Sequence, residues 1–339
     1  MSGEGEERAG YTNVHRAFLQ ALLSRQTITY PEAKPLLAAI ETAATPARLT
    51  LVEDVSQQDF DNYIHTLNEH ISPFDLEIRS TRHQATKLQV YALVNTTSDA
   101  LTQMATLRTA DEMAFVKRVL DAMFETNNSA RAEVMAVNSM QAVKLAKAPN
   151  DSAARRESGA GGQTQRAGQA ASAGLTLAQA ERVLADLVSE GWLELSAKGY
   201  YTLTPRALME LRGWLIDTYN EPSDEEDDED DEEPRERIKF CKACKEIVSM
   251  GQRCPTLTCP ARLHDGCVRN MFRAQGGNEQ CPVCKTAWTD APPVGEKAAR
   301  NGGDGRRAST NGNAAARRRS GGATSAVPDD ADDSSDTSV

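Results

Sequence analysis

The chain has 339 residues, and 49 acidic against 38 basic side chains give it a formal net charge of −11. This length exceeds a typical domain of about 100 to 150 residues, so we expect several folded units. No stretch reaches the roughly 18 consecutive apolar residues that a membrane span needs, and the N-terminus lacks the basic and apolar regions of a secretory signal. These features argue against a membrane or secreted protein and favour a reducing compartment, the cytosol or the nucleus.

The pattern over residues 10–105 predicts a winged helix. Apolar residues recur at helical spacing after Thr12, a second helix begins near Pro31, and a third follows Ser56, which is placed to cap it. Alternating apolar residues over 76–91 then predict a β-hairpin. Three helices closed by a hairpin are typical of a winged helix.

A second winged helix is predicted over residues 106–220. Its expected elements are helices over 110–125, 129–147 and 176–190, two short strands within 191–204, and a last helix that opens at Pro205. Residues 148–174 interrupt this module with Ala, Gly, Ser, Gln and Arg. Because they include too few apolar residues to be buried, they predict a disordered insertion.

An acidic linker is expected over residues 221–236. Eleven carboxylates fall between Glu221 and Glu233, as many as the whole net negative charge. A run of like charge repels itself and stays extended, so a solvated linker is the simpler interpretation. The alternative is an acidic strip that binds a basic partner.

The tail over residues 291–339 lacks apolar periodicity and is predicted to be disordered. Its arginines at 306–307 and 317–319 resemble a two-part nuclear import signal. The alternative is that these arginines only make the tail soluble.

Neither third helix carries the cations that insertion into a DNA groove requires. The helix after Ser56 has no Lys or Arg through Ile71, and the helix after Thr176 offers only Arg182. The first wing holds Arg79, Arg82, His83 and Lys87, which could touch a phosphate backbone without reading its sequence. We therefore expect both modules to contact protein, with a DNA contact that is only weak or indirect.

Seven cysteines and one histidine fall within 44 residues near the C-terminus, and the chain has no other cysteine. They read CxxC, C(x4)C(x4)HxxC and CxxC: Cys241, Cys244, Cys254, Cys259, His264, Cys267, Cys281 and Cys284. Zn²⁺ binds thiolate and imidazole, and its structural sites take four protein ligands, so this set predicts two bound zinc ions. A disulfide framework is the alternative, but an odd cysteine count without a secretory signal does not suit it.

From Leu175 to Trp288 the chain resembles the C-terminal half of the non-SMC element one family, a subunit of the Smc-five/Smc-six chromosome maintenance complex. The segments that carry the resemblance are AERVLADLVSEGWLELSAKGYYTLTPRALMELRGWLIDTY, CKACKEIVSMGQRCPTLTCPARLHDGCVRNMF and CPVCKTAW. Over residues 10–147 the resemblance is architectural only. The implied fold is mainly α with small β-hairpins: tandem winged helices followed by a small zinc-bound α+β variant RING, with a C4HC3 ligand set, over residues 237–290.

The resemblance also implies how the zinc ligands are shared, which spacing alone leaves open. The first ion would take Cys241, Cys244, His264 and Cys267, and the second would take Cys254, Cys259, Cys281 and Cys284. The family acts in the nucleus as a RING-type ubiquitin ligase in DNA repair by homologous recombination. Its winged helices bind a MAGE-family subunit, which in turn holds a kleisin subunit.

A RING ligase has no nucleophile of its own and works by orienting the ubiquitin thioester of a conjugating enzyme. The expected contacts to that enzyme are Ile247, Met271, Phe272, Pro282, Lys285 and Trp288. RINGs usually carry Ile or Val where this chain has Ala243, and often Arg where it has Lys285. Because Ala offers less apolar area and Lys lacks the planar fork of Arg, we expect weak activity that depends on the MAGE partner.

Two other functions fit the same ligand order. A PHD finger is also C4HC3 and would read histone tails, but PHD fingers usually place an aromatic residue where this chain has Glu279. The other is a zinc-stabilised structural adaptor without ligase activity, because metal binding supplies folding energy whatever else the module does.

Overall fold

The structure is a computed structural model and describes residues 10–96, 100–147, 174–220 and 236–299, all within one compact unit. Nearly all of the predicted insertion and of the acidic linker and most of the tail, namely residues 148–173, 221–235 and 300–339, lie outside these ranges. Among the described helices, none is both long enough and apolar enough to cross a membrane.

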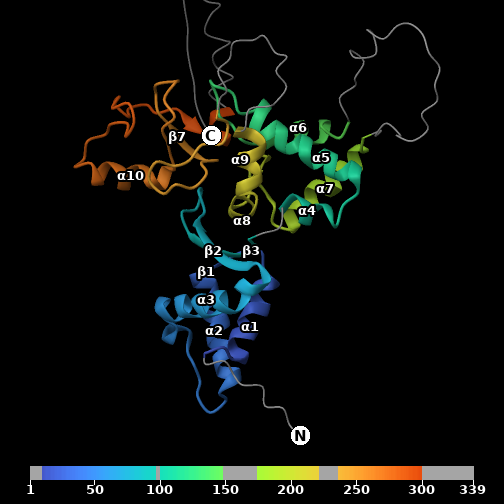
Figure 1. The fold of residues 1–339 in the computed structure, drawn as a ribbon, viewed down its shortest axis with the longest axis vertical. Helices are drawn as coiled ribbons and strands as arrows, with labels where there is room; N and C mark the ends of the chain where they lie inside the picture. The colour runs from blue at the N-terminus through green and yellow to red at the C-terminus, as the bar shows by residue number, and fades with distance from the viewer. Residues whose placement is uncertain (1–9, 97–99, 148–173, 221–235, 300–339) are drawn as a thin grey trace, which may run out of the picture. The chain divides into compact units, whose positions relative to one another are not determined.

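The first module is a winged helix, as the sequence predicts (Figure 1). Its elements are α1 (Asn13–Leu23), β1 (Ile28–Thr29), α2 (Tyr30–Ala44), α3 (Gln57–Ile71), β2 (Leu76–Arg82) and β3 (Gln89–Asn95), with single 3-10 turns at Val52–Asp54 and Ser72–Phe74. The strands form an antiparallel sheet in the order β1-β3-β2, and the β2–β3 hairpin is the wing. The Ser56 side chain accepts a hydrogen bond from the Asp59 N–H, which confirms the predicted cap of α3.

The second module repeats this topology. Its elements are α5 (Ala110–Asp121), β4 (Val137–Asn138), α6 (Ser139–Lys144), α7 (Leu177–Ser189), β5 (Leu193–Leu195) and β6 (Tyr200–Leu203), with α4 (Ala100–Ala105) before them and α8 (Pro205–Glu210) and α9 (Arg212–Asn220) after them. The strand order is β4-β6-β5, equivalent to that of the first module. The sequence did not reveal β1 or β4, because strands of two residues are too short to show alternation.

The predicted helix over 129–147 is wrong for most of its length, because only α6 is helical there. Asn128 and Glu133 instead form a β-bridge, and Met135 has a positive φ of 44°. The helix predicted to run to residue 125 ends at Asp121 and continues as a π-helix over Ala122–Thr126. The single helix predicted from Pro205 is two helices, α8 and α9.

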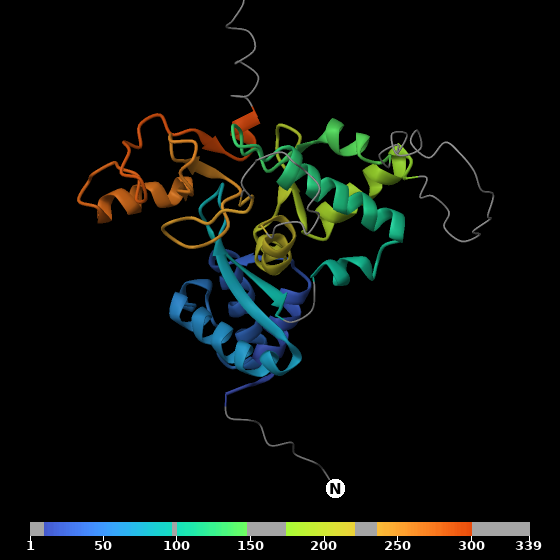
Figure 2. The same ribbon diagram turned by 45° about the horizontal axis from the view of Figure 1, so that its top comes forward.

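The first sheet is covered on both faces. Tyr91 and Leu93 of β3 face the core of the first module, where they join the buried Phe60. The alternate residues Ala92 and Val94 pack against Met209 of α8. Because residues two apart share a face of a strand, β3 joins the two winged helices through its second face (Figure 2).

The zinc domain contains β7 (Gly251–Arg253), β8 (Arg262–Leu263), α10 (Asp265–Ala274) and β9 (Pro293–Val294). The strand order is β8-β7-β9. The prediction that disorder begins at residue 291 is therefore wrong as far as residue 299, because β9 pairs with β7 and both Val294 and Ala298 are buried. A strand of two residues gave no periodic signal in the sequence.

Candidate zinc centres

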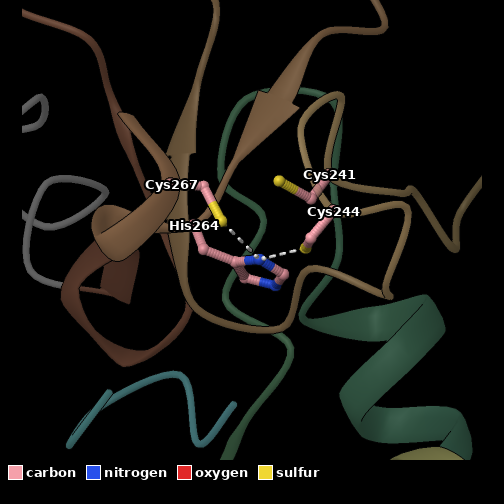
Figure 3. Close-up of side chains that lie close together, drawn as sticks. All are labelled: Cys241, Cys244, His264 and Cys267. Atoms are coloured by element: carbon pink, nitrogen blue, oxygen red, sulfur yellow. Dashed lines mark hydrogen bonds between the residues drawn. The ribbon is translucent and has the colours of Figure 1, made fainter. Parts of the chain in front are cut away.

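The eight predicted ligands form two groups of four. Cys241, Cys244, His264 and Cys267 make the first, and Cys254, Cys259, Cys281 and Cys284 make the second. Within each group the ligand atoms lie within 4.8 Å of one another. This is the alternating arrangement that the family resemblance implied. In the first group the four side chains point toward one another (Figure 3).

The distances within the groups suit zinc. A tetrahedral ion with Zn–S bonds of about 2.3 Å places neighbouring sulfurs about 3.8 Å apart. Cys254 Sγ lies 3.5 Å from Cys284 Sγ, and Cys259 Sγ lies 3.6 Å from Cys281 Sγ. His264 Nδ1 lies 3.2 Å from Cys244 Sγ and 3.8 Å from Cys267 Sγ. A Cys₃His set and a Cys₄ set could therefore each hold one zinc ion.

The two CxxC segments adopt the same turn. The Lys245 N–H donates to the Cys241 carbonyl, as the Lys285 N–H donates to the Cys281 carbonyl. Both lysines have a positive φ, 65° and 63°, and bridges join 240 to 247 in one turn and 280 to 287 in the other. Each turn brings its two thiols to one side of the chain, where a single ion can bind both.

His264 is oriented by a hydrogen bond on the far side of its ring. Its Nε2 lies 3.1 Å from the carbonyl oxygen of Ile247, so this nitrogen carries the proton and donates. Nδ1 then keeps its lone pair toward Cys244 and Cys267. Such an outer partner fixes the ring and the tautomer that a metal requires.

The thiols differ in acidity. A hydrogen bond with Cys244 chiefly lowers the pKa of Cys241, and hydrogen bonds with Thr286 lower the pKa of Cys284 to about 5. Burial chiefly raises the pKa of Cys259, to about 12. Each group thus has one thiol with a lowered pKa, and because zinc binds thiolates, its binding would release protons and depend on pH.

Glu133, from the second winged helix, is buried against the segment that links the two groups. Arg262 donates to its carboxylate from Nε and from Nη2, each at 2.6 Å, and Lys239 Nζ donates to it at 2.7 Å. Burial raises the pKa of Glu133, but Arg262 and Lys239 outweigh this effect and lower it to about 2. Sequence inspection missed this group, because a lone Glu inside an expected helix gives no signal.

The predicted conjugating-enzyme contacts divide by exposure. Ile247, Phe272 and Trp288 are buried, at 2%, 7% and 5% exposed. The Phe272 and Trp288 rings pack edge to face, and Trp288 Nε1 donates to Gln252 Oε1. These three side chains therefore pack in the core of the zinc domain, and a contact between them and a conjugating enzyme stays a prediction. Met271 and Pro282 are half-buried, and Lys285 is exposed.

Two of the four wing side chains proposed for DNA contact have partners within the protein. Arg79 Nε pairs with Glu77 at 2.8 Å, and His83 Nε2 lies 3.2 Å from Glu194 of the second wing. Arg82 and Lys87 line a cavity of about 310 Å³ between the first wing and the first zinc group.

Tandem winged helices joined to a C4HC3 zinc module define a class of RING-like proteins, and two family models match the chain accordingly. One, described as Nse1 non-SMC component of SMC5-6 complex, matches residues 15–211, and the other, a RING-like domain, matches residues 241–284. Because the first match covers more than half of this chain, the chain belongs to the Nse1 family.

Curated relatives are similar over nearly the whole chain. The non-structural maintenance of chromosomes element 1 homolog of Homo sapiens is 22% identical over 288 residues, which cover 85% of this chain and 88% of that protein. The Schizosaccharomyces pombe protein is 23% identical over 292 residues, with coverage of 86% and 99%. A solved structure titled Nse1-Nse3-Nse4 complex contains a chain that matches with a TM-score of 0.57 and 22% identity, covering 82% of this chain and 97% of that one. At this identity the match shows a shared fold.

Proposed function

We propose that this protein is a RING-type ubiquitin ligase subunit of the Smc5-6 complex, acting in the nucleus in DNA repair by homologous recombination. The observation that carries the proposal is the alternating C4HC3 arrangement of two zinc groups within a chain of the Nse1 family. That arrangement is the one a RING uses to hold two loops in fixed positions. A PHD-like histone reader shares the ligand order, but the RING-like match over 241–284 favours the ligase.

The chain would catalyse ubiquitin transfer by positioning alone. All seven cysteines lie in the two zinc groups, so none is free to act as a nucleophile. A zinc ion in each group would stiffen the surrounding loops. A conjugating enzyme held on those loops would present its thioester to a substrate lysine in a reactive orientation.

The docking surface would use the residues that stay accessible around the zinc loops. Met271, Pro282 and Lys285 remain from the predicted set. Ala243 and Val283 are also exposed, each between the two cysteines of a CxxC turn. Val283 is 47% exposed, so its side chain is accessible to another protein.

The partners would be a MAGE-family subunit and a kleisin subunit, bound through the winged helices. The solved relative is titled as a complex of Nse1 with Nse3 and Nse4, which supports such an assembly. Neither third helix is rich in cations, which favours protein contact over insertion into a DNA groove.

Ubiquitination by the full chain, with a panel of conjugating enzymes and with or without the MAGE subunit, tests the ligase. We expect chain formation that rises several-fold in Ala243→Ile and Lys285→Arg, which restore the usual RING residues, and falls in Val283→Asp. Leu107→Asp is the matched control, since Leu107 is 77% exposed outside the zinc domain. Zinc content measured for every variant separates lost docking from lost folding.

A zinc-stabilised adaptor is the second candidate. The burial of Ile247, Phe272 and Trp288 favours it, because side chains expected at the docking surface serve the core instead. Absence of ubiquitin transfer under every condition, from protein that holds two zinc ions and binds the MAGE subunit, would establish the adaptor and refute the ligase.

A further inference from the structure

The side chain of Gln84, in the first wing, forms hydrogen bonds with the zinc domain. Its Nε2 donates to the carbonyl oxygen of Ile247 at 2.9 Å, and its Oε1 accepts from the backbone N–H of Ser249 and of Met250 at 3.1 and 2.8 Å. The Ser249 hydroxyl donates to the same Oε1 at 3.2 Å. Gln84 thereby makes four hydrogen bonds to residues 247–250, which follow the first CxxC turn.

The carbonyl that Gln84 binds is also the one that orients a zinc ligand. Ile247 O accepts from Gln84 Nε2 at 2.9 Å and from His264 Nε2 at 3.1 Å. A carbonyl oxygen has two lone pairs, so it can accept both bonds at once. The wing therefore holds the peptide group that aims the His264 ring at Cys244 and Cys267.

The wing also packs beside the helix that carries the first group. A Cβ placed on Gly266, in the first turn of α10, would lie 3.6 Å from Lys87 Cγ. Gly266 sits between the ligands His264 and Cys267. The wing therefore contacts the two segments that supply the first group: Gln84 contacts the residues after the first CxxC turn, and Lys87 lies beside α10.

We propose that Gln84 is a positioning residue for the first zinc site. Through this side chain the first winged helix raises the zinc affinity of the first group, although Gln84 and its partner Ile247 lie 163 positions apart in the sequence. Removing the direct outer partner of a metal ligand typically weakens metal binding by about 10- to 100-fold, and Gln84 acts one hydrogen bond further out, so we expect the lower end, about 10-fold. The hydrogen bonds of Gln84 end beside the first group, so the second group keeps its affinity. This inference holds whether the protein is a ligase or an adaptor.

Competition with a chromogenic zinc chelator on the full chain tests it, using Gln84→Ala, Gln84→Glu and a matched control, Gln89→Ala. Gln89 lies in the same wing but donates to Ser80 Oγ within it, at 2.9 Å. Gln84→Glu is nearly isosteric and keeps the acceptor for Ser249 and Met250, but it replaces the donor to Ile247 by an oxygen.

We expect both Gln84 variants to give up one of two zinc ions about 10-fold more readily, with the other ion and the Gln89→Ala protein unchanged. Cobalt substitution identifies the ion, because Cys₃His and Cys₄ sites have different visible spectra, and the Cys₃His spectrum should be the one lost. Two results would overturn the proposal. One is wild-type zinc retention in Gln84→Glu, and the other is equal weakening of both sites, which would mean general loosening of the domain.

Discussion

Arg262 donates hydrogen bonds to the carboxylate of Glu133 from both Nε and Nη2, each at 2.6 Å, and both side chains are only 1% exposed. Arg262 Nη1 donates to the carbonyls of Cys259 and Ala261 at 2.8 Å. Glu133 of the second winged helix thus supplies the negative charge that balances Arg262. Arg262 lies between Cys259, a ligand of the second group, and His264, a ligand of the first. The zinc domain and the second winged helix therefore share a buried ion pair and are held in contact by it.

Glu133→Gln should be among the most destabilising single changes to the zinc-bound protein. It leaves the buried Arg262 without the carboxylate that it binds, and breaking a buried pair from one side costs about 3–5 kcal/mol. Urea unfolding in the presence of zinc measures this loss.

The partly exposed pair of Lys117 and Asp121, at 3.4 Å, provides the control for Glu133. Lys117→Ala removes an ion pair one helical turn apart, which is worth about 0.5 kcal/mol or less. A Glu133→Gln loss as small as that of Lys117→Ala would show that water reaches the pair and that it does not hold the zinc domain.

His15 should make the first winged helix less stable in mild acid. Its Nδ1 accepts from the Thr12 N–H at 3.2 Å, which requires the neutral ring. Burial, and then the charge of His70, lower the pKa of His15 below its ordinary value of 6.5. Because the unfolded chain then binds the proton more readily, this stability is present above about pH 6.5 and is lost as the pH falls.

His15→Gln separates titration from packing, because Gln at this position still completes a capping box with Thr12. The wild type should lose more stability than the variant between about pH 7.5 and about pH 5, by no more than the worth of a cap, about 1 kcal/mol. Thermal unfolding at the two pH values measures the difference. Parallel losses in the two proteins would assign the acid sensitivity to other groups.

Gly295 should tolerate no side chain. Its φ is +92°, and an added Cβ would lie 2.7 Å from the Ser249 carbonyl oxygen. Its N–H donates to the Glu133 carbonyl oxygen at 2.8 Å, so the chain after β9 cannot move away freely. Gly295→Ala should cost about 1–3 kcal/mol in the free energy of unfolding.

Gly213→Ala is the matched control for Gly295. Gly213 lies in α9, and a Cβ added there meets nothing within 4 Å. Ala in a helix is favoured over Gly by about 0.5–1 kcal/mol, so this variant should gain stability while Gly295→Ala loses it. Equal effects in chemical unfolding would mean that residues 291–299 are not held as the structure shows.

Local signals in the sequence were sufficient for the helices that carry their own caps and periodicity, such as α3 after Ser56 and α7 after Thr176, and for the identity of the eight zinc ligands. They were insufficient where a distant residue decides the local structure. Residues 128–136 are non-helical and bury Glu133, whose partner Arg262 lies 129 positions away. Trp288 shows the same limit, because an apolar side chain looks alike in sequence whether it serves a core or a docking surface.

Removing zinc should unfold the zinc domain and leave the first winged helix folded. The zinc groups hold together a module whose strands are two or three residues long, whereas the first module has its own core of Phe18, Leu37, Phe60 and Leu67. After chelation, hydrogen exchange should become fast over 236–299 and stay slow in α1 and α3.

Metal analysis should find two zinc ions per chain before chelation, and one in each of Cys267→Ser and Cys281→Ser, since each ligand belongs to a different group. Loss of protection throughout α1 and α3 on chelation would show that the first module depends on the metal as well, and two zinc ions retained in either Ser variant would contradict the assignment of ligands to groups.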